Sequence, residues 1–294
     1  MSHNGTLHAC SRGWKVALLL FALGLSLVGA CVEIVSAQQV FVGAGDIAGP
    51  WTQDEATARL LDNISGMVFT LGDNAYQNGT AAEFTTFYNP TWGRHRLRTR
   101  PSPGNHDYNI SPTPYFNYFY SNNPNLSSLD PNRLGYYSFN LVDWHIISLN
   151  SNVARGVGSA QEQWLRNDLM ANMKPCTLAY WHHPRFSSGG VHGNDASMDA
   201  LYRALYEFGA DVVLNGHDHI YERFAPQDPN AQADSTGIRQ FIVGTGLYPF
   251  GTIQPNSEVR NNTTHGVLKL TLHPDSYEWA LSPLPARPSA TRAA

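Results

Sequence analysis

Short apolar runs alternate with amphipathic segments in the first part of the chain. Residues 39–46 (QVFVGAGD) and 66–73 (GMVFTLGD) are apolar stretches that end in Gly-Asp, and we expect each to be a buried strand. Between them, residues 54–64 (DEATARLLDNI) repeat apolar positions at helical spacing, with Asp54 placed to be the N-cap. This order predicts a strand–helix–strand unit whose two strands run parallel.

The same alternation continues along the rest of the chain. We expect helices over residues 159–172, with Ser159 and Glu162 as a capping box, and over residues 195–208. Strands are expected over 176–182 and 210–219, and hairpins over 136–150, turning near Val142 and Asp143, and over 266–281. Because no internal repeat and no linker divides the chain, we expect a single α/β domain of two packed mixed β-sheets flanked by helices.

The N-terminal segment has the pattern of a signal peptide. Arg12 and Lys15 precede an uninterrupted apolar run over residues 16–28, which is too short to span a bilayer comfortably. A small-residue cleavage site ends at Ala37, which we favour, whereas Cys31 follows a lipoprotein-like box and stays open as an alternative. We therefore expect a leader over 1–37, the folded domain over 38–284 and a disordered tail over 285–294. Cleavage after Ala37 leaves Cys176 as the only cysteine, without a partner for an internal disulfide.

Charge and composition narrow the classes of partner. The formal net charge is −4, and the densest basic cluster, residues 94–100, is expected to be a solvated loop, with a rim that steers phosphate as the alternative. No nucleic-acid-binding surface is evident. Residues 108–135 are rich in Tyr, Phe, Asn and Pro, and we expect their aromatic side chains to form a local core rather than a stacking surface for a ligand.

Chemically active side chains stand where the predicted strands end. These positions are Gly45-Asp46, Gly72-Asp73, the stretch 104–107 (GNHD), the stretch 181–184 (WHHP) and the stretch 216–219 (GHDH). Carboxyl ends of strands in an open α/β sheet gather along one crevice, so these side chains can form one cluster. Carboxylates, an amide and imidazoles without a thiolate suit Fe, Mn or Zn, and the set is too large for one ion. Two ions that share one carboxylate would use all of it.

Each of these motifs alone is commonly a turn or a packed histidine, but their joint order along the chain favours a site. In that order the stretches GDIA (45–48), GDNAY (72–76), GNHD, WHHP and GHDH resemble the motifs of calcineurin-like metallophosphoesterases. The tyrosine of GDNAY and the Tyr-Glu-Arg at 221–223 are more specifically similar to the catalytic domain of purple acid phosphatases. One departure is Ala48, where the family usually has glycine.

The resemblance implies a role for each matching residue. It implies a dinuclear centre of Fe(III) with Fe, Zn or Mn, held by Asp46, Asp73, Tyr76, Asn105, His182, His217 and His219. In this centre Asp73 would bridge the ions, and His183 would lie at the rim.

Three further residues are catalytic candidates by the same resemblance. His106 would lie over the phosphate, and Asp107 would orient His106. His192 would be the leaving-group acid, although an exposed histidine without a role is its simpler interpretation.

The expected function follows from the resemblance. We expect an exported, acid phosphatase-like enzyme that hydrolyses small phosphomonoesters by in-line attack of a metal hydroxide, with residues 38–284 as its catalytic domain. A phosphodiesterase or nucleotidase with the same centre is the alternative among enzymes, and a binding protein on the same scaffold is the non-catalytic alternative. Membrane association is expected only through lipidation at Cys31, and the sequence does not set the oligomeric state.

Overall fold

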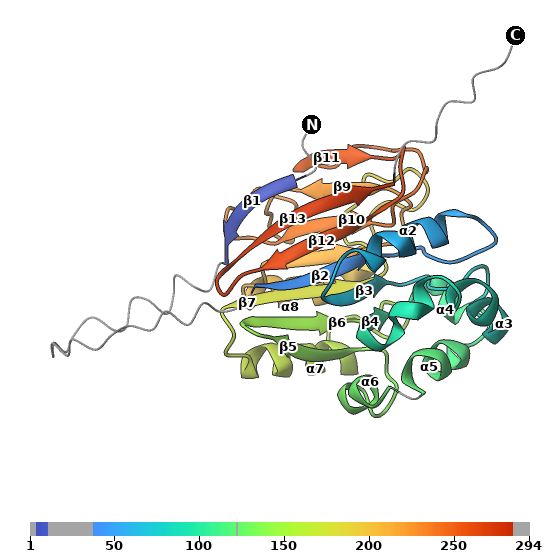
Figure 1. Cartoon of the computed structure of the whole chain (residues 1–294). Helices are drawn as coiled ribbons and strands as arrows, with labels where there is room; N and C mark the ends of the chain where they lie inside the picture. Colours follow the sequence, from blue (N-terminus) through green and yellow to red (C-terminus); the bar gives the residue numbers. More distant parts are fainter. Residues whose placement is uncertain (1–3, 11–37, 122, 285–294) are drawn as a thin grey trace, which may run out of the picture.

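The computed structural model describes residues 4–10, 38–121 and 123–284, which form two mixed β-sheets packed face to face (Figure 1). The first sheet has the order β1 (Asn4–Ala9), β13 (Ser276–Pro283), β12 (Gly266–Leu272), β2 (Gln39–Ala44), β3 (Met67–Leu71) and β4 (Thr99–Ser102). The second has the order β11 (Ser257–Asn261), β9 (Tyr221–Phe224), β10 (Arg239–Val243), β8 (Val212–Asn215), β7 (Cys176–Trp181), β6 (Trp144–Ser148) and β5 (Tyr137–Leu141).

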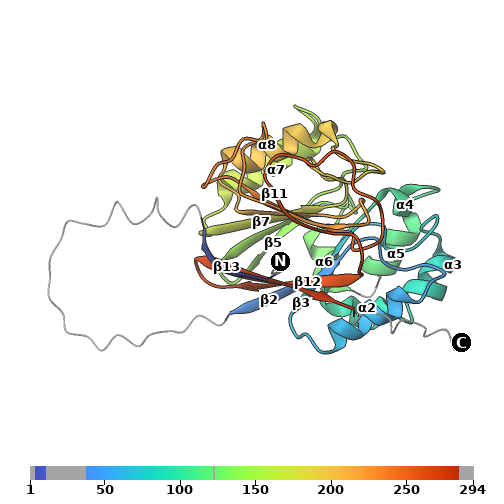
Figure 2. The same cartoon turned by 90° about the horizontal axis from the view of Figure 1, so that it is seen from above.

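Helices cover the outer faces of this sandwich. In Figure 2, α7 (Ala160–Ala171) and α8 (Asp199–Glu207) lie outside the seven-stranded sheet, and α2 (Gln53–Asp62) lies outside the six-stranded one. Shorter helices follow β3 and β4: α3 (Ala81–Glu83), a π-helix (Phe84–Tyr88), a 3-10 helix (Trp92–Arg98), α4 (Asn105–Tyr108), α5 (Thr113–Tyr120) and α6 (Pro124–Leu129). The predicted fold class, two packed mixed sheets with flanking helices, is confirmed.

The two sheets are held together by apolar side chains on their facing surfaces. Phe41 on β2 packs against Phe69 on β3, with ring centroids 4.8 Å apart, and against Tyr180 on β7 of the other sheet at 5.7 Å. All three side chains are fully buried, so the contact removes large apolar surfaces from water. This packing holds the parallel strands β2 and β3 opposite β7 and β8, and so fixes where their carboxyl ends meet.

Several predicted boundaries are confirmed and others shift. The hairpins form as β5–β6 and β12–β13, and Val142 in the first turn has φ 54. Helix α2 begins one residue earlier than predicted, with Thr52 at the N-cap position, so Asp54 is wrong as the N-cap. Asp54 instead lies in the first turn, where its Oδ1 accepts from the Glu55 amide at 2.8 Å. The helix predicted over 195–208 is a 3-10 turn (Ala196–Met198) followed by α8.

The basic cluster at 94–100 is a structural element rather than a solvated loop. Arg94 pairs with Asp62 and Glu55 at 2.8 Å. Arg98 donates to the carbonyls of residues 61, 64 and 66 at 2.7–2.9 Å, which satisfies backbone acceptors at the end of α2.

The aromatic segment forms a local core, as expected. Tyr115, Phe119 and Tyr120 of α5 are buried, with Tyr115 and Phe119 ring centroids 5.1 Å apart. None of these rings lines the cavity described below.

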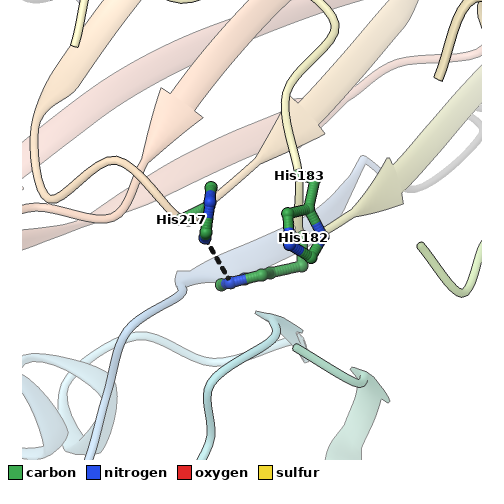
Figure 3. Close-up of side chains that lie close together, drawn as sticks. All are labelled: His182, His183 and His217. Atoms are coloured by element: carbon green, nitrogen blue, oxygen red, sulfur yellow. Dashed lines mark hydrogen bonds between the residues drawn. The ribbon is translucent and has the colours of Figure 1, made fainter. Parts of the chain in front are cut away.

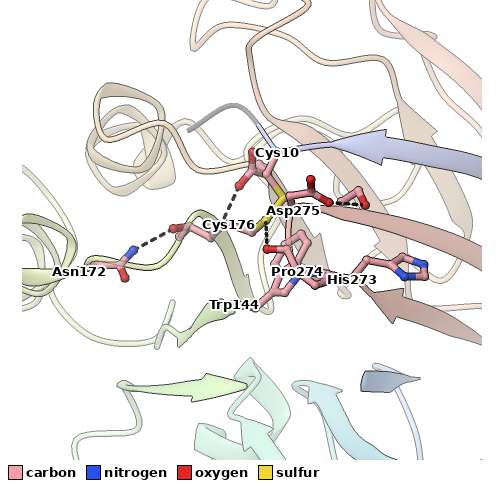
Figure 4. Close-up of a disulfide and its surroundings, with 10 residues drawn as sticks. Cys10, Trp144, Asn172, Cys176, His273, Pro274 and Asp275 are labelled. Atoms are coloured by element: carbon pink, nitrogen blue, oxygen red, sulfur yellow. Dashed lines mark hydrogen bonds between the residues drawn. A yellow bond between two sulfur atoms is a disulfide. The ribbon is translucent and has the colours of Figure 1, made fainter. Parts of the chain in front are cut away.

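Residues 4–10 fall within the segment predicted to be a leader, yet here they form β1 on the edge of the six-stranded sheet. Cys10 is disulfide-bonded to Cys176 at the start of β7, with Cα atoms 5.4 Å apart (Figure 4). In the uncleaved chain Cys176 thus has a partner, whereas the expectation of a lone Cys176 concerns the chain cleaved after Ala37, which lacks Cys10. Residues 11–37 and the predicted tail at 285–294 lie outside the described residues, and cleavage after Ala37 stays a prediction. Among the helices of the described ranges, none is both long and apolar enough to span a membrane.

Two measurements distinguish a chain cleaved after Ala37 from one that keeps β1. Cleavage after Ala37 gives a protein that begins at Gln38 and carries one thiol, Cys176, because Cys10 and Cys31 leave with the leader. In an uncleaved chain the disulfide uses Cys10 and Cys176, and Cys31 is the remaining cysteine, so the identity of the free thiol differs and the number does not. We expect N-terminal sequencing to begin at Gln38, and alkylation in denaturant without reductant, followed by peptide mapping, to label Cys176. A chain that begins before Cys10 and shows no reactive Cys176 would mean that β1 and its disulfide belong to the mature protein.

Candidate metal centre

The strand-end motifs converge at one end of the sandwich, where the carboxyl ends of β2, β3, β7 and β8 meet. Asp46, Asp73 and His217 have φ values of 58, 49 and 70, in the left-handed region that residues other than glycine rarely adopt. Such strain persists where the surrounding structure enforces it, and it gathers at functional sites. The backbone at these three strand ends therefore keeps a strained conformation that directs the side chains toward the site.

Gly104 shows how closely the backbone approaches this site. A Cβ atom at Gly104 would lie 2.1 Å from Asp73 Oδ1 and 2.2 Å from the Asp73 amide nitrogen. Only glycine fits there, so the turn that carries Asn105 and His106 can lie directly against Asp73. The amide of His106 also donates to Asp73 Oδ1 at 2.8 Å, which fixes the carboxylate's orientation.

The first group of donor atoms surrounds the hydroxyl of Tyr76. Its Oη lies 2.9 Å from Asp46 Oδ1, 3.1 Å from Asp73 Oδ2 and 3.1 Å from His219 Nε2. A phenol carries one proton and can donate to only one of these atoms. Electron-rich atoms are therefore in excess, which is the arrangement that a cation among them would balance.

The second group surrounds Nε2 of His182, which is fully buried. This atom lies 3.0 Å from Asn105 Oδ1 and 3.2 Å from Asp73 Oδ2. It also lies 3.1 Å from His217 Nδ1, the contact that Figure 3 shows. Nδ1 of His182 lies 2.7 Å from the Leu71 carbonyl, an acceptor that places the proton on Nδ1 in the neutral ring. Nε2 then presents its lone pair to the group.

The spacing of these atoms fits metal coordination. Ligand atoms about 2.1 Å from one ion and at right angles to each other lie about 3 Å apart, which is the separation within each group. Asp73 Oδ2 belongs to the two groups, as a bridging carboxylate does. The donors are carboxylate, amide and phenol oxygens and imidazole nitrogens, which suit Fe, Mn or Zn. All of the predicted metal ligands are thus brought together, and the residues fit a pair of ions.

The protonation equilibria of the site also favour bound cations. Burial and the carboxylates of Asp46 and Asp73 raise the pKa of Tyr76 far above its ordinary value. A phenolate there needs a cation beside it. Burial, followed by the neighbouring His182 and His183, lowers the pKa of His217 far below its ordinary value, so its imidazole is neutral.

Asp73 and His182 form the buried ion pair between the two groups. Burial opposes charge on each, but their mutual attraction is stronger, which lowers the pKa of Asp73 to about 2 and raises that of His182 to about 9. A proton on His182 Nε2 occupies the place that a metal ion would take.

His183 lies beside the ligands without joining either group. Its Nδ1 is 2.7 Å from Ser151 Oγ, and its ring centroid is 4.2 Å from that of His217 (Figure 3). His182, His183 and His217 nevertheless hold nitrogen atoms within 4.8 Å of one another.

The structure places His106 as expected, but Asp107 differently. His106 lines the cavity, with Nδ1 2.6 Å from the Gln77 carbonyl and Nε2 3.8 Å from Asp73 Oδ2, so Gln77 rather than Asp107 orients its ring. The fully buried Asp107 carboxylate accepts from the Asn74 side chain at 2.8 Å and from the Gly104 amide at 2.9 Å. Burial, together with the charge of Asp73, raises the pKa of Asp107 to about 7. Asp107 joins the turns that carry Asp73 and Asn105.

His192 is exposed, and its ring stacks on the ligand His217 with centroids 3.9 Å apart. Asp218 holds it there: its carboxylate accepts from the amides of His192 at 3.2 Å and Gly193 at 3.1 Å. Sequence reasoning missed this role of Asp218. The signal was present in GHDH, where a buried carboxylate stands between two ligands.

One cavity of about 520 Å³ opens over these groups. Its walls include Asp46, Asp73, Tyr76, His217, His219, His106 and His192. The site is therefore a pocket with the donor atoms at its floor and two additional imidazoles beside them.

Comparison with known proteins agrees with this geometry. The model of the calcineurin-like phosphoesterase family matches residues 40–221, which include every predicted ligand. The chain belongs to the calcineurin-like phosphoesterase family. Within that family it is similar to purple acid phosphatase 21 of Arabidopsis thaliana, at 31% identity over 77% of this chain and 57% of that protein. The chain spans about half the length of the curated relatives it matches.

Two solved structures show the same fold. A purple acid phosphatase from yellow lupin (Lupinus luteus) seeds matches with a TM-score of 0.66 and 17% identity, over 81% of this chain and 50% of that one. GAP50, described as the anchor in the inner membrane complex of Plasmodium, matches with a TM-score of 0.62 and 11% identity, over 86% of this chain and 87% of that one. At these identities the likeness concerns the fold alone.

Asp107→Asn tests the joint between the two turns. An amide cannot accept from all the donors that face the carboxylate, and it adds an N–H group without a partner in a buried place. We expect a loss of about 1–3 kcal/mol in the free energy of unfolding, measured by urea denaturation of metal-free protein. Glu278→Gln on β13, away from the cavity, is the control and should change stability little. Equal stability of D107N and the parent would mean that the hydrogen bonds of Asp107 between the two turns contribute nothing to the free energy of unfolding.

Proposed function

We propose that this protein is an exported phosphatase that hydrolyses small phosphomonoesters at a two-metal centre, in the manner of acid phosphatases. The observation that carries the proposal is the shared Asp73 Oδ2, which lies 3.1 Å from Tyr76 Oη in one donor group and 3.2 Å from His182 Nε2 in the other. Two ions joined by one carboxylate form the clamp that in-line phosphoryl transfer uses. Curated relatives that carry the name purple acid phosphatase support this choice.

The chain's own residues would divide the work at this centre. Asp46, Tyr76 and His219 would hold an Fe(III) ion, and Asn105, His182 and His217 a second ion of Fe, Zn or Mn, with Asp73 between them. When bound, the ions supply a water of lowered pKa as nucleophile and neutralise charge on the phosphoryl oxygens. His106, with Nδ1 held by the Gln77 carbonyl, keeps Nε2 on the cavity side, where the doubly protonated ring can donate to a phosphoryl oxygen.

His192 is placed to give a proton to the departing alkoxide or phenoxide. Its ring lies on the cavity wall over His217. The hydrogen bond from its backbone amide to the Asp218 carboxylate holds its backbone in place. Proton donation of this kind typically contributes 10²–10⁴-fold to rate. The non-catalytic alternative, a binding protein on the same scaffold, is disfavoured because every ligand position keeps a side chain able to bind metal.

Removal of a ligand tests the centre directly. We expect Asp73→Asn and His217→Ala, loaded with Fe and Zn, to lose at least about a hundredfold in kcat/KM for 4-nitrophenyl phosphate. Elemental analysis should show fewer than two ions per chain in each. His273→Ala, a histidine in the β12–β13 turn, is the matched control and should keep its metals and activity. Full turnover by metal-loaded D73N or H217A would refute the proposed function.

Tyr76 decides which kind of centre this is. Tyrosinate bound to Fe(III) absorbs visible light by charge transfer, so iron-loaded parent protein should be coloured. We expect Tyr76→Phe to lose the colour while iron, measured by elemental analysis, stays bound through the remaining ligands. Tyr248→Phe removes a hydroxyl from the same cavity and should keep the colour. Colour that persists in Y76F would exclude Tyr76 as the ligand.

A further inference from the structure

The walls of the cavity differ in kind from its floor. Above the donor groups, the rim carries Trp51, Val191, Leu247 and Tyr248. Trp51, Val191 and Leu247 are exposed by 36%, 50% and 61%, and they are among the few large apolar side chains that the described residues leave open to solvent. Single exposed apolar residues are ordinary on a protein surface, but a group of them around one active-site mouth indicates a binding surface.

Trp51 is held as a fixed wall. Its indole ring lies over Gly49, where a Cβ would come within 2.6 Å of the ring, and its Nε1 donates to the Ile47 carbonyl at 3.4 Å. The ring centroid is 5.3 Å from that of Tyr76, so the indole continues the aromatic surface outward from the donor group. Gly49 follows Ala48, the position at which this chain departs from the family pattern, and it leaves the space that the indole occupies.

Tyr248 is a second aromatic residue of the cavity wall. Its ring stacks on His219 with centroids 4.1 Å apart and an interplanar angle of 6°, and its amide donates to the His219 carbonyl at 3.2 Å. Leu247, the preceding residue, extends this wall to the exposed rim. The lining of the cavity therefore includes an indole, a phenol ring and a leucine.

The charged side chains of the cavity also favour an uncharged leaving group. Of the described residues that line the cavity, none is lysine or arginine, and the charged ones are the carboxylates of Asp46 and Asp73 at the floor. A leaving group with its own phosphates or carboxylates would find no lysine or arginine on the wall to pair with, and burying an unpaired charge is costly. An uncharged aromatic leaving group loses little and gains apolar contact.

We infer that the rim formed by Trp51, Leu247 and Tyr248 selects phosphomonoesters whose leaving group is an uncharged, extended aromatic ring system, over nucleoside polyphosphates. This inference rests on the proposed function and adds to it a substrate class and the residues that choose it. The rim acts on binding of the leaving group, so its effect falls mainly on KM, whereas the ligands of the floor control turnover.

The test compares two aryl esters on the metal-loaded full chain. Phenyl phosphate and 2-naphthyl phosphate release phenols of similar acidity and differ in apolar area. The naphthyl-to-phenyl ratio of kcat/KM therefore measures how much the rim favours the larger leaving group. We expect the second ring to raise kcat/KM about tenfold in the parent. Trp51→Ala and Leu247→Ala should each bring the ratio close to one, and Trp51→Phe should keep part of it. Met173→Ala, which removes a fully exposed methionine after α7, should leave the ratio unchanged.

A second variant tests whether an added positive charge shifts the substrate preference toward ATP. Leu247→Lys places a cation at an exposed position of the rim, where folding tolerates it. This variant should raise kcat/KM for ATP severalfold and lower the naphthyl-to-phenyl ratio.

A parent ratio of one, or a ratio that survives Trp51→Ala together with Leu247→Ala, overturns the inference while leaving the phosphatase intact. Absence of hydrolysis of either ester by metal-loaded parent would overturn the proposed function, and the inference with it.

Discussion

The structure depends on one carboxylate, that of Asp73, whose two oxygens are assigned to different tasks. Oδ1 accepts the His106 amide at 2.8 Å, and Oδ2 faces the two donor groups. This division requires the carboxyl end of β3 to turn through a left-handed residue, φ 49, and requires a glycine at position 104 to let the next turn approach. The packing of the two sheets enforces this strained conformation, because Phe41 and Phe69 pack on Tyr180 and hold the strands in place.

The same arrangement explains why a cation is needed. Aspartates, a phenol, an amide and imidazoles with electron-rich atoms about 3 Å apart would repel one another unless protons or metal ions lay between them. Protons can satisfy part of this set, as the Asp73–His182 pair shows, because attraction by Asp73 raises the pKa of His182 to about 9. Around Tyr76 a single hydroxyl proton faces the carboxylate oxygens of Asp46 and Asp73, and His219 Nε2, 3.1 Å away, donates or accepts according to its protonation. Metal ions would replace these protons and remove the conflict.

Part of this structure is predictable from the sequence, because Gly-Asp and Gly-His follow apolar runs that can only be buried strands. The gathering of the strand-end motifs, the hairpins and the two-sheet class were accessible in that way, whereas the individual ligand roles come from the family resemblance and stay predictions. Strand β4 was not, since its residues, TRPS, lack an apolar pattern and contain a proline that only an edge strand tolerates. The role of Asp107 was also hidden, because its partner Asn74 lies 33 residues away in the chain. The same holds for Cys10 and Cys176, which are 166 residues apart.

The metal centre does not depend on how the N-terminus is processed. The predicted ligands follow β2, β3, β4, β7 and β8, whereas β1 is the far edge strand of the six-stranded sheet and pairs with β13, with Asn4 opposite Ala280 and Ala9 opposite Ser276. Loss of β1 would uncover Trp279, whose ring now lies 4.8 Å from that of His8. Arg223 and Arg239 also stack on Trp279, at 5.1 and 4.9 Å, and these contacts come from the other sheet. Without β1, β13 would become the edge strand, but it stays paired with β12 along seven residue pairs, so the loss costs local contacts and leaves the strand ends that position Asp73 unchanged.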